Sequence, residues 1–236
     1  MRTTKNTLFI VIFGLFIGST TVMAEEKSAT SVINNAYNYI DKLQNYAFDA
    51  IVIDKSKNDG NVVGQYKHTI NIKVARPNRL RVDIKGDLKN SINYLNNGTY
   101  TIVDYESNYY GELKTPKNIN QALDFIFDKY GIRSPLATLI YTDMSKRARF
   151  TRSKYFGKEI VSGVECDYIA FKNSSKEIHI WVATGDKPIV KYYTEFNEFY
   201  QINTTIFWNE NPQISNSNFI FTAPTDAVKI SIESAN

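Results

Sequence analysis

Side chains that could catalyse a reaction or bind a metal are few in this sequence. It has two histidines, His68 and His179, each within an alternating, strand-like stretch, and one cysteine, Cys166. A metal site built on either histidine would need carboxylates from distant strands, and a lone histidine in a strand is usually structural. Cys166 lies in a further alternating stretch, which favours a small buried residue over a reactive thiol. We therefore expect no metal and no cofactor.

Motifs of the common enzyme classes are also missing from the sequence. It contains no GxSxG, GxGxxG, P-loop or HExxH pattern. Asp124 and Asp128 share one face of an expected helix, but nothing around them indicates burial, so we expect solvated carboxylates rather than an acid and base pair. No nucleophile with a base and an orienting third group can be assembled. The sequence predicts a protein that is not an enzyme.

Residues 1–24 have the pattern of a secretory signal peptide. Arg2 and Lys5 precede an apolar run over residues 8–18 that is too short to span a membrane comfortably, and small residues lead to a cleavage site at Ala24. An uncleaved N-terminal anchor is the alternative interpretation. We expect cleavage near Ala24 and export to the periplasm of residues 25–236, with no integral membrane span in the mature chain.

Charge and cysteine content narrow the class further. The full sequence has 28 basic and 24 acidic residues, and loss of the signal peptide removes two basic residues and no acidic one. The remaining basic residues are dispersed along expected strands, which is typical of solvated faces and argues against nucleic-acid binding. One cysteine cannot form a disulfide within the chain, so we expect stability to come from a large core.

The periodicity of apolar residues predicts a mainly β protein of the α+β class. Residues 28–46 and 118–132 have helical spacing. A second short helix is expected over 134–144, with Ser134 as N-cap and Pro135 at the first helical position. Most of the rest alternates with the period of strands. The later strands are expected within 147–173, 177–186, 189–199, 200–211 and 218–224. No repeat or linker divides residues 25–236, so we expect one domain.

Two sets of motifs resemble a known superfamily. The stretches VARPNRLRVDIKGD (74–87) and INYLNNGTYTIVDYESNYY (92–110) combine a strand, an Arg-Pro-Asn corner, an Arg-bearing strand and an Asn-Gly hairpin. This order resembles the LolA-like lipoprotein carriers. YGIRSPLATLI, GVECDYIAF, IHIWVATGDKPIVKY and FWN resemble an uncharacterised family of predicted periplasmic proteins in the same superfamily.

The resemblance implies an antiparallel half-barrel of about eleven strands wrapped over lid helices, with an apolar cavity between them. Arg76 matches an arginine that, in LolA, hydrogen-bonds to the lid and holds the empty cavity closed. The alternative for Arg76 is a corner residue that covers strand ends and pairs with an acid. The lid helices differ from those of LolA in sequence, so the cargo does not carry over.

Apolar side chains on the inward face of the expected strands and helices would line this cavity, although a filled core would satisfy the same pattern. They are Ile70, Ile72, Val74, Leu80, Val82, Ile84, Phe125, Ile126, Leu136, Ile140, Ile180, Val182, Tyr192, Ile206 and Trp208.

Three functions are compatible with these features. The leading one is a periplasmic carrier or sensor that holds a lipid or an acylated protein cargo in the cavity. The second is an envelope protein-interaction or stress-sensing module with a transient protein partner and no transport activity. The third is an enzyme acting on a lipid or glycan, for which Asp124 or His179 would have to prove essential.

Overall fold

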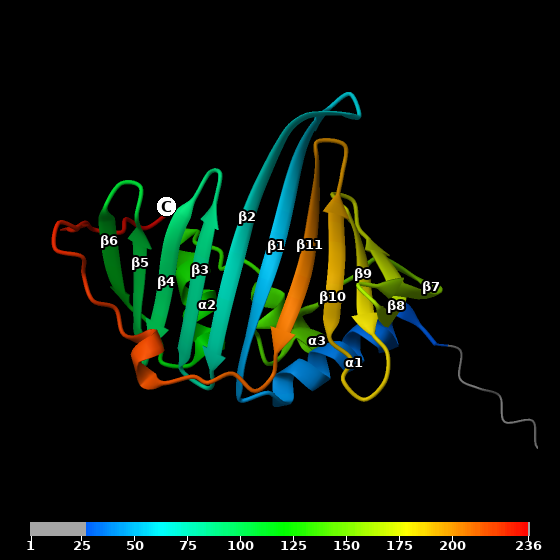
Figure 1. The fold of residues 1–236 in the computed structure, drawn as a ribbon, viewed down its shortest axis with the longest axis horizontal. Helices are drawn as coiled ribbons and strands as arrows, with labels where there is room; N and C mark the ends of the chain where they lie inside the picture. The colour runs from blue at the N-terminus through cyan, green and yellow to red at the C-terminus, as the bar shows by residue number, and fades with distance from the viewer. Residues whose placement is uncertain (1–26, 236) are drawn as a thin grey trace, which may run out of the picture.

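The computed structural model describes residues 27–235, which form one curved β-sheet over a layer of helices (Figure 1). The helices are α1 (Ala29–Lys42), α2 (Ile119–Tyr130) and α3 (Met144–Arg147), with 3-10 turns η1 (Ala137–Leu139) and η2 (Asn216–Phe219). The strands are β1 (Asn45–Asn58), β2 (Asn61–Ala75), β3 (Arg79–Gly86), β4 (Asn90–Asn96), β5 (Thr99–Asp104), β6 (Tyr109–Lys114), β7 (Arg152–Val161), β8 (Val164–Lys172), β9 (Glu177–Ala183), β10 (Val190–Phe196), β11 (Tyr200–Asn209) and β12 (Val228–Lys229).

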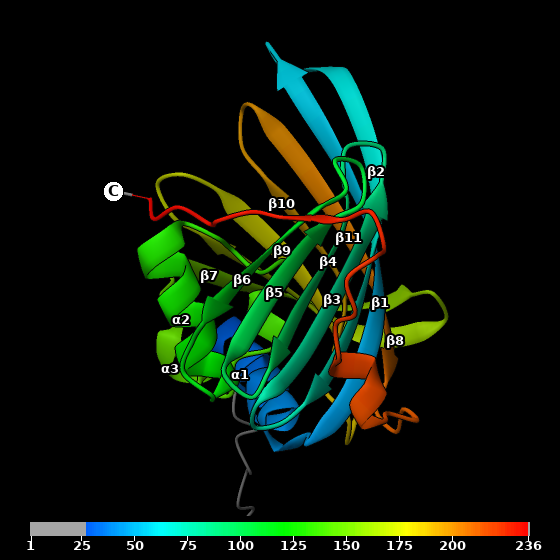
Figure 2. The same ribbon diagram turned by 90° about the vertical axis from the view of Figure 1, so that its left-hand side faces the viewer.

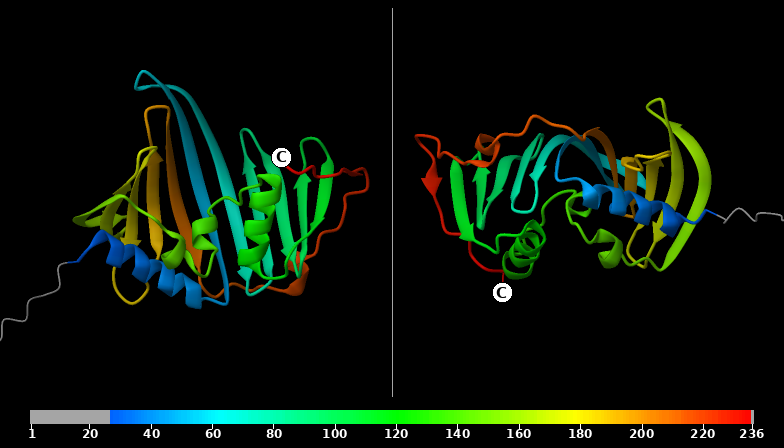
Figure 3. Two further views of the ribbon diagram at one scale, coloured as in Figure 1. Left: turned by 180° about the vertical axis from the view of Figure 1, so that it is seen from behind. Right: turned by 90° about the horizontal axis from the view of Figure 1, so that it is seen from below.

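All twelve described strands belong to one sheet, in the order β12-β6-β5-β4-β3-β2-β1-β11-β10-β9-β8-β7. Every neighbouring pair is antiparallel except β12 with β6. The sheet does not close between β7 and β12, and it curves around α1, α2 and α3 (Figure 2 and Figure 3). This confirms the expected half-barrel: eleven longer strands, with a two-residue β12 at the edge.

Alternation in the strands explains where the core lies. In the β2–β3 pair, Ile72 faces Val82 and Val74 faces Leu80, so one face of the sheet is continuously apolar. The turns that reverse the chain use residues that tolerate positive φ, as at Asn97 and Gly98 between β4 and β5. The apolar face packs against α1 and α2, whose buried residues include Ile33 and Ile126 in the same core.

The second helix expected over 134–144 does not form. Leu136, directly after Pro135, has a φ of 55°, which stops helix propagation, and only η1 and the four-residue α3 follow. The carbonyl of Leu139 accepts a hydrogen bond from the Tyr46 hydroxyl, and that of Ile140 accepts one from Arg76. These carbonyls are therefore satisfied by distant residues rather than by a next helical turn.

The strand expected over 218–224 is also absent. This segment is η2 followed by irregular chain that lies along the outer face and edge of the sheet (Figure 1). Phe219 is fully buried, and Phe221 packs its ring 5.8 Å from that of Tyr94 and 5.0 Å from that of Tyr110. The C-terminal segment thus packs over the rings of Tyr94 and Tyr110 and then adds β12 beside β6, which shields that edge from pairing with other chains.

Candidate ligand-binding cavity

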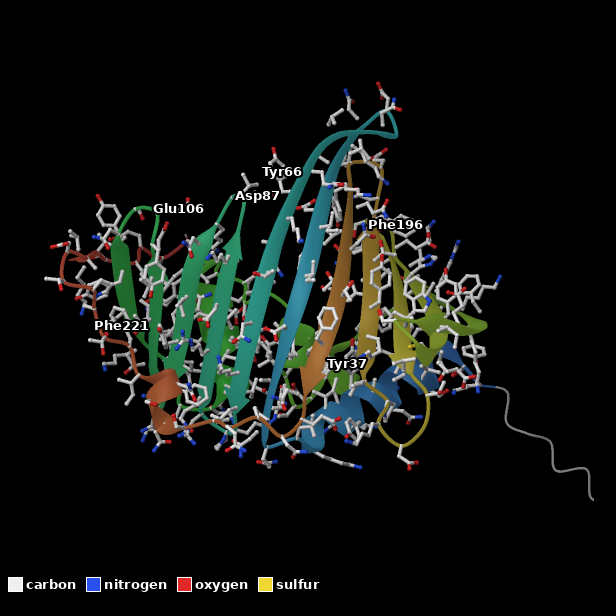
Figure 4. All side chains as sticks on the ribbon, in the orientation of Figure 1. Tyr37, Tyr66, Asp87, Glu106, Phe196 and Phe221 are labelled. Atoms are coloured by element: carbon white, nitrogen blue, oxygen red, sulfur yellow. The ribbon has the colours of Figure 1, made fainter. Side chains whose placement is uncertain are left out.

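A cavity of about 650 Å³ lies between the concave ends of β8–β10 and a cover made by α1, α2 and the segment 132–150, here called the lid segment. Tyr37, labelled in Figure 4, enters the wall from α1 beneath the sheet. Most lining side chains are apolar. They include Ile33, Tyr37, Leu123, Phe127, Ile132, Leu136, Ala137, Leu139, Tyr141, Met144, Ala148, Phe150, Phe171, Ile178, Ile180, Val190 and Tyr193.

The inner wall of the cavity is aromatic and withdrawn from water. Phe171 is almost fully buried, and its ring stacks 3.9 Å from that of Phe150 in the lid segment. Burial, with a smaller contribution from Tyr193, raises the pKa of Tyr37 to about 12. Burial also raises the pKa of Tyr193. Both phenols therefore stay neutral at physiological pH, and this wall offers apolar contact without negative charge.

The lid segment is held to α2 by an ion pair. Both guanidinium nitrogens Nη1 and Nη2 of Arg147 donate to the Asp124 carboxylate, at 2.8 and 2.9 Å, and Arg147 Nε donates to Asp143. The Tyr141 hydroxyl donates to the same Asp124 at 2.9 Å. Asp124, expected to be solvated, therefore serves as the acceptor that fixes the lid segment on α2. Arg147 is the last residue of α3, and helix periodicity alone could not identify it as the partner of Asp124.

This ion pair predicts acid-sensitive attachment of the lid segment. Hydrogen bonds from Arg147 lower the pKa of Asp124 below its usual value. A depressed pKa means that the stabilisation is present above about pH 4 and is lost as pH falls through the folded-state pKa. We expect amide-exchange protection of residues 137–148 to fall in that acid range. The Asp124→Asn variant should already show the lower protection at neutral pH.

The matched control for this prediction is Asp128→Asn, which removes an exposed carboxylate one turn further along α2. It should leave protection of the lid segment and its acid dependence unchanged. Equal protection in wild type and Asp124→Asn across the pH range would contradict the role given to the ion pair.

Arg76 connects the sheet corner to both α1 and the lid segment. Its Nε donates to the Leu43 carbonyl at 2.9 Å, its Nη1 donates to the Ile140 carbonyl at 2.9 Å, and its Nη2 donates to the Tyr46 hydroxyl at 3.1 Å. Within residues 27–235, no carboxylate forms an ion pair with Arg76. Arg76 therefore bonds to two backbone carbonyls and a hydroxyl rather than to an acid, and its role as a latch stays a prediction.

The predicted cavity residues fall into three groups. Leu136 and Ile180 line the cavity. The second group belongs to the hydrophobic core. Ten of its residues are buried in that core, and two more, Phe125 and Trp208, are partly buried against it. The ten buried residues are Ile70, Ile72, Val74, Leu80, Val82, Ile84, Ile126, Ile140, Val182 and Ile206.

Tyr192 forms the third group because it lies on the opposite face of the sheet. A register shift between Val190 and Tyr192 pairs Tyr192 with Trp181, and the two rings contact each other at 5.0 Å. The bulge reverses the alternation, so Tyr193 points into the cavity in its place. Trp181 continues an outer row of rings through Tyr168, at 4.5 Å.

Two basic residues of the cavity lining were not predicted from the sequence. The run 146–152 contains Lys146, Arg147, Arg149 and Arg152, and this concentration was the available signal that basic residues are not all dispersed. Arg147 and Arg149 both line the cavity.

Two other candidate chemical groups, Cys166 and His179, contact residues of the fold itself. Cys166 is fully buried, as expected, and burial raises the pKa of its thiol. His179 contacts the Tyr168 hydroxyl through Nδ1 and Glu177 through Nε2.

Within residues 27–235, no three His, Cys, Asp or Glu side chains are grouped to hold a metal ion. In the same range no helix is both long and apolar enough to cross a membrane. The expected signal peptide lies outside the described residues.

The fold is an open, mostly antiparallel half-barrel that curves over short helices and borders an apolar cavity. The chain belongs to the DUF2092 family, described as predicted periplasmic protein, whose model matches residues 29–233. No curated protein matches the sequence.

Solved structures are similar to this chain at low sequence identity. An uncharacterized conserved protein from Thermus thermophilus is 7% identical with a TM-score of 0.51, over 87% of this chain and 99% of that chain. The Mycobacterium tuberculosis lipoprotein LppX is 10% identical with a TM-score of 0.45, over 79% of this chain and 98% of that one. A LolA superfamily protein from Nitrosomonas europaea is 7% identical with a TM-score of 0.38, over 83% and 98%.

Proposed function

We propose that this protein is a periplasmic binding protein that holds the acyl chain of a lipid or lipid-anchored cargo in its cavity, as a carrier or sensor. The observation that carries the proposal is the cavity of about 650 Å³ walled by Phe171, Ile180 and Tyr193 and covered by the lid segment. This volume is typical of small-molecule sites, which are concave and mostly apolar. Each methylene transferred from water into such a site contributes about 0.8 kcal/mol, so a long chain binds without many specific contacts.

The lid segment gives the cavity a means to open. Its attachments, the Arg147 ion pair with Asp124 and the Arg76 bond to Ile140, are polar contacts between separate elements rather than part of the sheet. Polar contacts of this kind exchange with water more readily than strand pairing. Release of the lid segment would admit or discharge an acyl chain while the half-barrel stays folded. Export after cleavage near Ala24 would place this activity in the periplasm.

The test is to purify the exported protein from the periplasm without detergent, and to combine native mass spectrometry with lipid extraction. We expect bound acyl species, or uptake of added palmitate in a one-to-one complex. A protein that is empty and also fails to take up added acyl ligands would contradict the proposal.

A second candidate, a protein-interaction module of the envelope, is favoured by the outer row of rings. Phe156, Tyr168, His179 and Trp181 follow one another across β7–β9, and Phe156 is 45% exposed. Aromatic side chains are enriched in the buried centres of interfaces. A partner that co-purifies with the exported protein, dissociates on Phe156→Ser and ignores added lipid would favour this function over the carrier.

A further inference from the structure

The polar side chains that line the cavity are unbalanced in charge. Five of them are basic and one, Glu195, is acidic. The basic ones are Arg133, Arg147, Arg149, Lys172 and Lys176. They come from the lid segment, from the last residue of β8 and from the turn between β8 and β9, beside the aromatic wall formed by Phe150 and Phe171.

Three of the five cations already have acidic partners. Arg147 is bound to Asp124 and Asp143, as described above. Lys176 contacts Glu195 at 2.8 Å, and Lys172 contacts Glu177 at 3.1 Å. These contacts neutralise most of the charge on that side of the cavity.

Arg133 and Arg149 differ, because neither forms an ion pair within the part of the chain that the structure describes. The Arg133 guanidinium lies 3.9 Å from the centre of the Phe127 ring. A guanidinium stacked on a ring keeps the N–H groups along its edge free to bind a carboxylate or phosphate with two parallel bonds. Among residues 27–235, Arg149 donates to the backbone carbonyls of Lys146 and Ala148 and to no side chain.

Both arginines are exposed and yet belong to the cavity lining, which places them at its opening rather than its floor. The apolar lining starts beside them at the partly exposed rings of Phe127, on which Arg133 stacks, and Phe150, which follows Arg149 in the chain. Phe150 in turn stacks on the buried ring of Phe171. The site thus has two parts, a deep apolar one and a cationic one at the mouth. This polarity matches an amphiphile whose chain enters first and whose head group stays at the opening.

We propose that the cavity selects acyl ligands with an anionic head group, a carboxylate or a phosphate, through Arg133 and Arg149 at its mouth. This inference rests on the proposed function, because the acyl chain has to occupy the cavity for the head group to reach the arginines. Charge-assisted hydrogen bonds are stronger than neutral ones, so the head group decides which acyl ligand is retained.

The experiment compares ligands that share a chain and differ in head group. Palmitate and hexadecanol form one pair, and palmitoyl lysophosphatidic acid and monopalmitoylglycerol form the other. Each is titrated against wild type preloaded with an apolar fluorescent dye, and displacement is followed. We expect each anion to bind at least about tenfold more tightly than its neutral partner. The two pairs show whether a carboxylate or a phosphate is preferred.

Variants then assign the preference to the arginines. Arg133→Gln/Arg149→Gln should reduce the ratio of anionic to neutral affinity towards one. Arg152→Gln/Lys154→Gln removes the same charge from exposed residues just beyond the lid segment that do not line the cavity, and should keep the wild-type ratio. The wild-type comparison between ligands does not depend on either variant folding.

Each outcome has one meaning. Equal affinity of wild type for anionic and neutral ligands would overturn the head-group proposal and leave acyl binding intact. A preference that survives in Arg133→Gln/Arg149→Gln would overturn the role of these two residues. Dye displacement by none of the four ligands would instead reject the proposed function itself.

Discussion

The Arg76→Ala variant is expected to lose about 3 kcal/mol of folding free energy, since a hydrogen bond to a charged group contributes roughly 1.5–3 kcal/mol and the losses are not additive. The substitution removes three donors at once and leaves the carbonyls of Leu43 and Ile140 without the partner that the fold provides. Because one of these bonds reaches the lid segment, we also expect amide exchange of residues 137–148 to accelerate more than exchange in β1 and β2. Urea unfolding and hydrogen exchange measure the two effects.

Two further variants separate the contributions. Tyr46→Phe removes the hydroxyl that donates to Leu139 and accepts from Arg76, and should cost about 1 kcal/mol. Arg152→Ala removes an exposed arginine and should change stability by about 0.5 kcal/mol or less. If Arg76→Ala lowered global stability without loosening the lid segment selectively, Arg76 would be a structural corner residue and not a lid latch.

Filling the cavity from both walls should weaken acyl binding strongly. Ile180 lies on β9 and Ala148 on the lid segment, and both line the cavity. In Ile180→Trp/Ala148→Trp, two indoles would occupy space that the chain needs. Exclusion of about four methylenes would cost about 3 kcal/mol, which weakens palmitate binding by about a hundredfold. Dye-displacement titration measures this loss directly.

The control for cavity filling is Lys67→Trp, which adds an indole at an exposed position of β2 outside the cavity lining. It should bind palmitate as wild type does. The double variant must also keep a cooperative unfolding transition, since overpacking commonly costs about 1–3 kcal/mol per site. Wild-type affinity in a folded Ile180→Trp/Ala148→Trp variant would show that acyl chains bind elsewhere.

The sheet was predictable because strand alternation is a local property. Ile72 and Val82 were expected on the inward face, and both are completely buried. Regular alternation needs only the identity of neighbouring residues, and a one-residue slip would have moved every apolar side chain to the solvent. The two longer helices follow from spacing for the same reason, and the Asn97–Gly98 turn follows from the tolerance of both residues for positive φ.

Prediction from local sequence failed where contacts with distant residues, or an irregularity in a strand, overrode the local pattern. Pro135 at a first helical position argued for a helix, but the carbonyls of Leu139 and Ile140 bond to Tyr46 and Arg76 from the other half of the chain. A single bulge likewise placed Tyr192 on the outer face and Tyr193 in the cavity, because an extra residue in one strand reverses all later alternation.

The sequence by itself determined the mainly β class, the two longer helices, the inward face of the early strands and the corner at Arg76. Only the tertiary structure decided which apolar residues line open space and which fill the core, because both kinds have the same periodicity. It also decided that Asp124 meets Arg147 and that Arg133 and Arg149 line the same cavity. Side chains of the lid segment meet α2 and the strands β8–β10 only when the sheet curves around the helices.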